Sequence, residues 1–95
     1  MESKEDYRKK IEAQLKEWGE IIEELKNKAS KAAGELKKEH ESEIKTLVDK
    51  KNDMQKQLKE FISSSDDAWK VMRKGLEKAA TDIKKAFKQA RKKYK

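Results

Sequence analysis

The sequence predicts an all-α protein in which one long helix is followed by a shorter C-terminal helix that folds back on it as an antiparallel hairpin. Three observations predict this fold class. Of the 95 residues, 47% are charged and only 34% are hydrophobic, which is typical of long helices and coiled coils. The chain has no proline and only three glycines, so little opposes helix formation. Its apolar residues recur every three or four positions, the period of one helix face.

The first helix is expected over residues 4–62. Its apolar residues begin in alternating steps of four and three, the heptad pattern of a coiled-coil seam, at Ile11, Leu15, Trp18, Ile22, Leu25, Ala29, Ala32 and Leu36. The stripe then continues through His40, Ile44, Leu47, Lys51, Met54, Leu58 and Phe61. Gly34 weakens this helix. A break there, giving three helices of similar length, is the alternative interpretation.

A turn is expected over residues 63–67, where the sequence reads Ser-Ser-Ser-Asp-Asp. Serine is a preferred N-cap, and aspartate suits the positive N-terminal end of a helix. A second helix is therefore expected over residues 68–94, within the single domain 1–95. Its apolar residues follow an eleven-residue period, which keeps a stripe nearly straight. Because short turns favour antiparallel packing, the predicted hairpin core comprises Leu58, Phe61, Trp69, Met72, Leu76 and Ile83.

The shorter second helix would leave the first half of the long helix uncovered. A narrow apolar stripe needs another helix to bury it. The sequence therefore predicts a coiled-coil-like homo-oligomer, with a dimer as the expected state. The predicted oligomer interface comprises Ile11, Leu15, Trp18, Ile22 and Leu25.

The basic residues are concentrated near the C-terminus. Residues 1–62 carry 15 Lys/Arg and 15 Asp/Glu, whereas residues 63–95 carry 11 and 4, so the net charge of +7 arises entirely from the second segment. Residues predicted to dock an anionic partner are Lys84, Lys85, Lys88, Arg91, Lys92 and Lys93. The partner would be an anionic lipid surface entered by Ile83, Phe87 and Tyr94, or nucleic-acid phosphates. Alternatively, the lysines face Glu35, Glu39 and Glu43 of the opposing helix.

The sequence indicates binding rather than enzymatic chemistry. It has no cysteine and one histidine, His40, with Glu43 the one carboxylate near its helical face. Ser63, Ser64 and Ser65 have no base in a nucleophile arrangement and are interpreted as capping residues. We therefore expect no catalytic, cofactor or metal site and no small-molecule substrate. The N-terminus lacks a signal-like apolar stretch, and no apolar run is long enough to span a membrane, so a cytoplasmic location is expected.

The segment Asp67-Ala-Trp-Lys-Val-Met-Arg-Lys-Gly-Leu-Glu-Lys-Ala-Ala resembles part of a family of small bacterial coiled-coil proteins of unknown function. Met72 and Arg73 stand where that family has Leu-Lys. The resemblance implies a coiled-coil fold and no particular chemistry. The eleven-residue period is also similar, more distantly, to apolipoproteins and phasin-type granule coat proteins. The predicted function is structural self-assembly. The alternative is a basic amphipathic helix that binds an anionic lipid or granule surface, or nucleic-acid phosphates.

Overall fold

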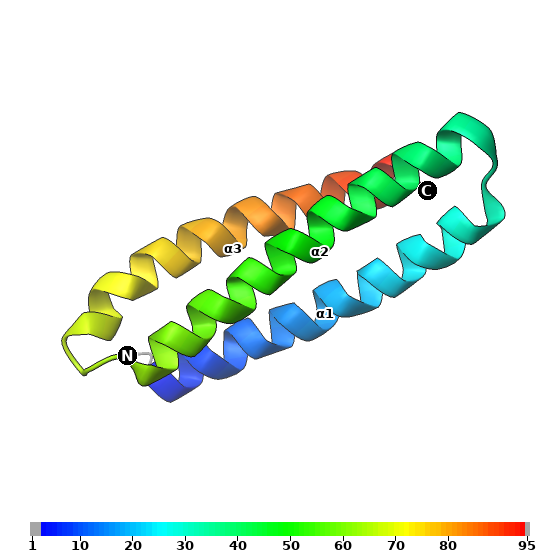
Figure 1. Ribbon diagram of the computed structural model, residues 1–95. Helices are drawn as coiled ribbons and strands as arrows, with labels where there is room; N and C mark the ends of the chain where they lie inside the picture. Colours follow the sequence, from blue (N-terminus) through cyan, green and yellow to red (C-terminus); the bar gives the residue numbers. More distant parts are fainter. Residues whose placement is uncertain (1–2, 95) are drawn as a thin grey trace.

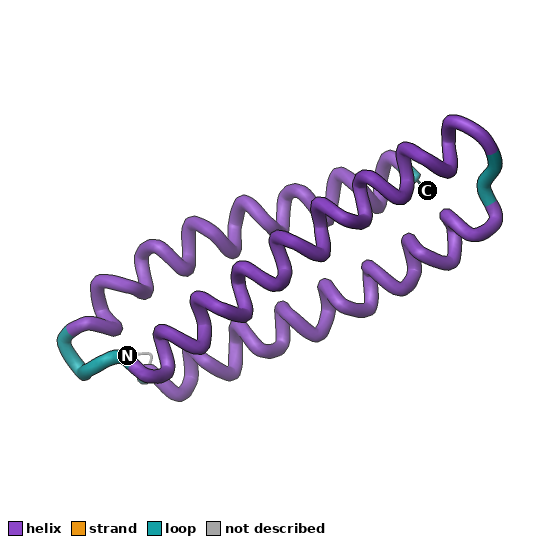
Figure 2. Tube along the Cα trace, in the orientation of Figure 1, coloured by secondary structure: helices purple, strands orange, loops and turns teal. Residues whose placement is uncertain are grey.

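The computed structural model describes residues 3–94 as three long helices: α1 (Lys4–Lys31), α2 (Gly34–Ser63) and α3 (Ala68–Lys93). The helices lie side by side and alternate in direction along the chain (Figure 1). They form a narrow bundle of 51 × 18 × 16 Å, with one connection at each end (Figure 2). The all-α class predicted from the sequence is confirmed, but the number of helices is three rather than two.

The prediction of a continuous helix over residues 4–62 was wrong, because the helix is interrupted between α1 and α2. Ala32 and Ala33 are extended, with ψ values of 162° and 155°, and Gly34 has a φ of +64°. A positive φ is readily adopted by glycine and strained for other residues. The break lies beside Gly34, where the alternative interpretation placed it. It folds α2 back along α1, so the apolar stripe of α1 is covered by its own chain.

The other helix ends follow local sequence signals. At the start of α1, the Ser3 hydroxyl accepts a hydrogen bond from the Asp6 backbone N–H, and the Asp6 carboxylate accepts one from the Ser3 N–H, forming a capping box. At the start of α3, the Ser65 hydroxyl accepts a 3.4 Å hydrogen bond from the Ala68 N–H. The serine and aspartate run therefore connects α2 to α3.

A single apolar core runs the length of the bundle. The five residues predicted to form the oligomer interface are all buried in it: Ile11, Leu15, Trp18, Ile22 and Leu25. The argument that they need a second chain therefore no longer holds, since α2 and α3 cover them. Of the predicted hairpin core, Leu58, Phe61, Leu76 and Ile83 are buried, and Trp69 and Met72 are partly buried against the same cluster.

Candidate anion-binding surface

The surplus positive charge belongs to one helix of the bundle. α3 carries ten basic and two acidic residues, a net charge of +8, whereas α1 and α2 together carry fifteen basic and fourteen acidic residues. Because α3 lies along one side of the molecule (Figure 1), this charge forms a surface rather than a tail.

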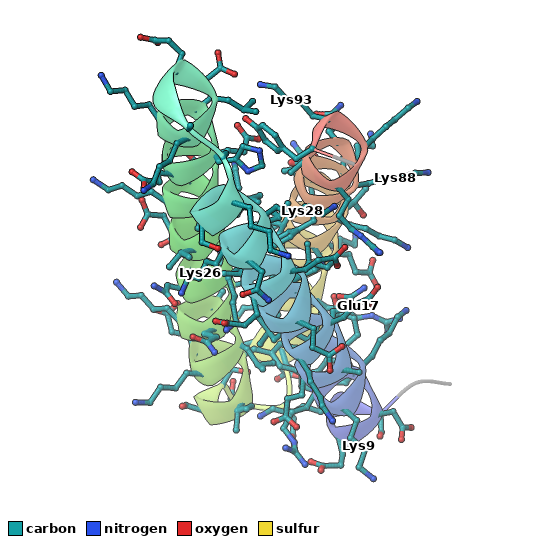
Figure 3. All side chains as sticks on the ribbon, turned by 90° about the vertical axis from the view of Figure 1, so that its right-hand side faces the viewer. Lys9, Glu17, Lys26, Lys28, Lys88 and Lys93 are labelled. Atoms are coloured by element: carbon teal, nitrogen blue, oxygen red, sulfur yellow. The ribbon has the colours of Figure 1, made fainter. Side chains whose placement is uncertain are left out.

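The two sides of α3 differ in chemistry. Toward the core it buries Leu76, Ala80, Ile83, Phe87, Ala90 and Tyr94. On the opposite side it exposes a row of lysines that we call the lysine ridge: Lys70, Lys74, Lys78, Lys84, Lys85, Lys88 and Lys92. At 3.6 residues per turn these positions fall within an arc of about 120°, and they extend over about 33 Å. Lys88 points away from the bundle in Figure 3.

The ridge lysines form no ion pair with the described part of the chain. Within residues 3–94, no carboxylate lies within 4.0 Å of a ridge ammonium group. The two arginines of α3 lie beside the ridge and are paired. Arg73 binds Glu77 at 3.0 Å, and Arg91 lies 3.8 Å from Glu24 of α1. The ridge is therefore a cationic strip, interrupted by the exposed Glu77 and Thr81, which fall within the same arc.

Four of the six residues predicted to dock an anionic partner belong to the ridge: Lys84, Lys85, Lys88 and Lys92. Arg91 instead faces α1. Lys93 lies against the Tyr94 ring, 5.3 Å from its centroid. The Tyr94 phenol, with smaller contributions from Glu43 and Glu39, raises the pKa of Lys93. Arg91 thus faces an acidic residue of another helix, but this residue is Glu24 of α1 and not one of the glutamates named in the alternative interpretation.

Sequence reasoning missed the first half of the ridge. Lys70, Lys74 and Lys78 follow one another at four-residue steps, and Lys78, Lys85 and Lys92 at seven-residue steps. Both spacings keep side chains on one face of a helix. Examining lysine periodicity, rather than charge per segment, would have found the whole strip.

The apolar residues expected to enter a lipid interface are not available at this surface. Ile83, Phe87 and Tyr94 are 7%, 1% and 7% exposed, because they pack into the bundle core. The large apolar residue that α3 does expose is Val71, which is 75% exposed. In the folded chain, contact through α3 is therefore electrostatic.

A groove of about 850 Å³ borders the ridge between α1 and α3. The stacked rings of Trp18 and Phe87 contribute to its lining. The α3 side is basic, with Lys84, Lys88, Arg91 and Lys92, while α1 contributes Glu17, Glu24 and Lys28. The mixed charges of the α1 side make the groove less suited to an anion than the outer face of α3.

Other kinds of site have less support. No group of three or more His, Cys, Asp or Glu residues within the described part of the chain is placed to hold a metal ion. None of the three helices, over residues 3–94, combines the length and apolar content that crossing a bilayer requires.

No protein-family model, curated protein or solved structure matches this sequence. The resemblance to small bacterial coiled-coil proteins therefore stays a prediction.

Proposed function

We propose that this chain is a small helical binding protein that holds a nucleic-acid backbone along the lysine ridge of α3. The observation that carries the proposal is the exposed, unpaired state of seven lysines on one face of one helix, over residues 3–94. The proposed role is binding rather than catalysis.

The dimensions of the ridge suit a phosphate backbone. Its length of about 33 Å is close to one turn of duplex DNA, about 34 Å. Lysines that neutralise phosphates release condensed counterions, and this release drives association. Besides its lysines, the ridge arc holds Glu77 and Thr81 and no aromatic or amide side chain, so it lacks the groups that stack on bases. We therefore expect binding with little sequence preference.

Burial of the α3 apolar face favours nucleic acid over insertion into lipid. An interfacial helix places aromatic and aliphatic residues among the lipid headgroups and acyl chains. Here Ile83 and Phe87 are core residues, so insertion would require the bundle to open. The structure gives no support to self-assembly, the function predicted from the sequence, because its five proposed contact residues are buried within one chain.

The test is a titration of a fluorescent 20-base-pair duplex with the protein at salt concentrations from 50 to 200 mM. Seven phosphate contacts predict a slope of log K against log salt of about −6, since each contributes about −0.9. A ridge variant carrying Lys78→Gln, Lys85→Gln and Lys92→Gln should reduce the magnitude of this slope by about 3. The matched control carries Lys38→Gln, Lys56→Gln and Lys59→Gln, three exposed lysines of α2.

The control has the same net charge as the ridge variant, so comparing them separates local contact from overall charge. Retention of binding by the control alone would support the ridge. Equal losses in both variants would contradict it, because total charge would then explain the affinity. Failure to bind the duplex, together with binding to phosphatidylserine vesicles, would overturn the nucleic-acid assignment in favour of a membrane surface.

A further inference from the structure

A pocket of about 420 Å³, separate from the groove between α1 and α3, lies at one end of the bundle. At this end α1 ends, α2 begins and α3 ends. It is lined by Lys28 and Lys31 of α1, Leu36 and His40 of α2, and Lys93 and Tyr94 at the end of α3. Lys28 and Lys93, from different helices, are labelled in Figure 3. All three charged lining residues are lysines, of which Lys28 is paired with Glu24 at 3.8 Å, so Lys31 and Lys93 give the pocket most of its positive charge.

Two polar side chains of this pocket are buried without a hydrogen bond of good geometry. His40 is 4% exposed and Tyr94 is 7% exposed, and their ring centroids are 3.6 Å apart. Within the described residues, neither the His40 Nδ1 nor the Tyr94 hydroxyl makes a hydrogen bond of good geometry, although the Lys93 ammonium group interacts with the Tyr94 phenol. Buried polar atoms normally have one. Among the described residues, His40 is also the one buried residue of the polar or charged class. Its position within an apolar core is therefore unusual.

The N-terminus of α2 lies at the same end of the bundle. Its N-cap residue is Ala33, which supplies no side-chain hydrogen bond to the first turn. The unpaired backbone N–H groups and the helix dipole both favour an anion at such a terminus. Acidic residues are also near: Glu35 lies in the first turn, and Glu39 and Glu43 interact with Lys93. None of these three lines the pocket.

We propose that this pocket binds a phosphate monoester. A phosphate dianion presents three terminal oxygens, which can accept from the lysine ammonium groups. The Tyr94 hydroxyl and the His40 Nδ1 are buried and donate to the phosphate when their rings move to uncover them. These donors belong to three helices, so they suit a tetrahedral anion better than a planar carboxylate. Ala32 and Leu36, the latter 51% exposed, add an apolar wall for the organic group of the ester. This site is separate from the lysine ridge and does not depend on it.

Isothermal titration calorimetry with phenyl phosphate tests the proposal. The expected result is one binding site per chain, with weaker binding of inorganic phosphate because it lacks the apolar group. Tyr94→Phe keeps the ring and removes the hydroxyl, and Lys93→Gln removes one charge. Each should weaken phenyl phosphate binding roughly tenfold, since a hydrogen bond or contact with a charged group is lost. Tyr7→Phe, the same change at the opposite end of the bundle, is the matched control.

Two-dimensional amide NMR spectra of each variant would separate loss of binding from loss of folding. The proposal is overturned if phenyl phosphate fails to bind the folded chain at millimolar concentration, or if Tyr94→Phe and Lys93→Gln bind it as well as Tyr7→Phe does. Equal affinity for inorganic and phenyl phosphate would overturn the assignment to a monoester.

The phosphate could belong to a nucleic-acid end or to a free small molecule. The two sources are compared with a variant that carries Lys78→Gln, Lys85→Gln and Lys92→Gln, so that the ridge contributes less to oligonucleotide binding. Tighter binding of a 5′-phosphorylated trinucleotide than of its 5′-hydroxyl form would support the proposal with a nucleic-acid end as the ligand. Equal binding of the two trinucleotides, with phenyl phosphate still bound, would support it with a free small molecule as the ligand.

Discussion

The Trp18 indole and the Phe87 ring stack across α1 and α3, with centroids 5.5 Å apart and only 5° between their planes. They are 3% and 1% exposed. From the sequence, Trp18 was expected to contact a second chain and Phe87 was considered for a lipid interface. In the fold each covers the other. This pair joins α1 to α3. It buries the apolar surfaces of Trp18 and Phe87, which the two-helix prediction had left for a second chain or a lipid surface to cover.

Phe87→Ala should lower the free energy of unfolding by about 3–5 kcal/mol, since it leaves a cavity under Trp18. A double-mutant cycle with Trp18→Ala should give a coupling of about 0.5–1.5 kcal/mol from ring stacking. Urea unfolding followed by circular dichroism measures both. Val71→Ala, at a residue that is 75% exposed, should change stability by less than about 0.5 kcal/mol. Equal effects at positions 71 and 87 would contradict the packing of α3.

The state of association follows from the same burial. Since Ile11, Leu15, Trp18, Ile22 and Leu25 are covered within the chain, we expect sedimentation equilibrium at tens of micromolar to give the monomer mass of 11.2 kDa. Leu15→Ala should then destabilise the monomer by about 2–5 kcal/mol. A dimer that Leu15→Ala dissociates into folded monomers would instead support the self-assembly predicted from the sequence.

Hydrophobic periodicity predicted most of the buried residues but not which chain covers them. Leu36 of the predicted stripe is 51% exposed, and the buried Tyr7 and Ile21 were not part of it. The heptad steps from Ile11 to Leu25 are equally compatible with a partner chain and with a second segment of the same chain, because both bury the same stripe. The choice depends on whether the backbone turns at Ala32 and Ala33. Both are alanines, which favour helix, so local propensity opposes the observed turn. Gly34 was the one signal, and long-range packing of α2 decides the outcome.

The candidate sites were predictable to different degrees. The lysine ridge needs only the identity of the buried face of α3, which the spacing of Leu76, Ile83 and Phe87 supplies. The His40 and Tyr94 pair was not predictable, because these residues meet only when α2 and α3 pack in the observed register. A lone histidine on an apolar stripe gives no indication of the aromatic ring beside it.

The two glycines at positions 34 and 75 should respond to alanine in opposite directions. Gly34 has a φ of +64°, so Gly34→Ala should destabilise the bundle by about 1 kcal/mol. Gly75 lies within α3, and an added Cβ there would meet nothing within 4 Å. Gly75→Ala should therefore stabilise the protein by about 0.4–1 kcal/mol. Thermal and urea unfolding compare the two variants, and a stabilising Gly34→Ala would contradict the turn.

Straightening of the turn is the alternative conformation open to Gly34→Ala. A continuous helix over residues 4–62 would expose the apolar stripe of α1 and favour exchange with a second chain. We therefore expect a larger dimer fraction for Gly34→Ala than for Gly75→Ala at the same concentration, measured by sedimentation. Identical monomer fractions across the accessible concentration range would show that the turn is kept in both variants.

Asp6 gives folding a specific acid dependence. Hydrogen bonding from the Ser3 side chain, and then from its backbone N–H, lowers the pKa of the Asp6 carboxyl in the folded state. A carboxyl with a lowered folded pKa stabilises the fold above its unfolded pKa of about 3.9, and this contribution disappears as the pH falls through the folded pKa. Asp6→Asn should therefore reduce the melting temperature at pH 7, and the difference from wild type should shrink toward pH 2.

Asp53→Asn, at an exposed residue of α2, is the matched control. A difference for Asp6→Asn that stays constant from pH 7 to pH 2 would show that the capping box does not depend on the ionised carboxylate.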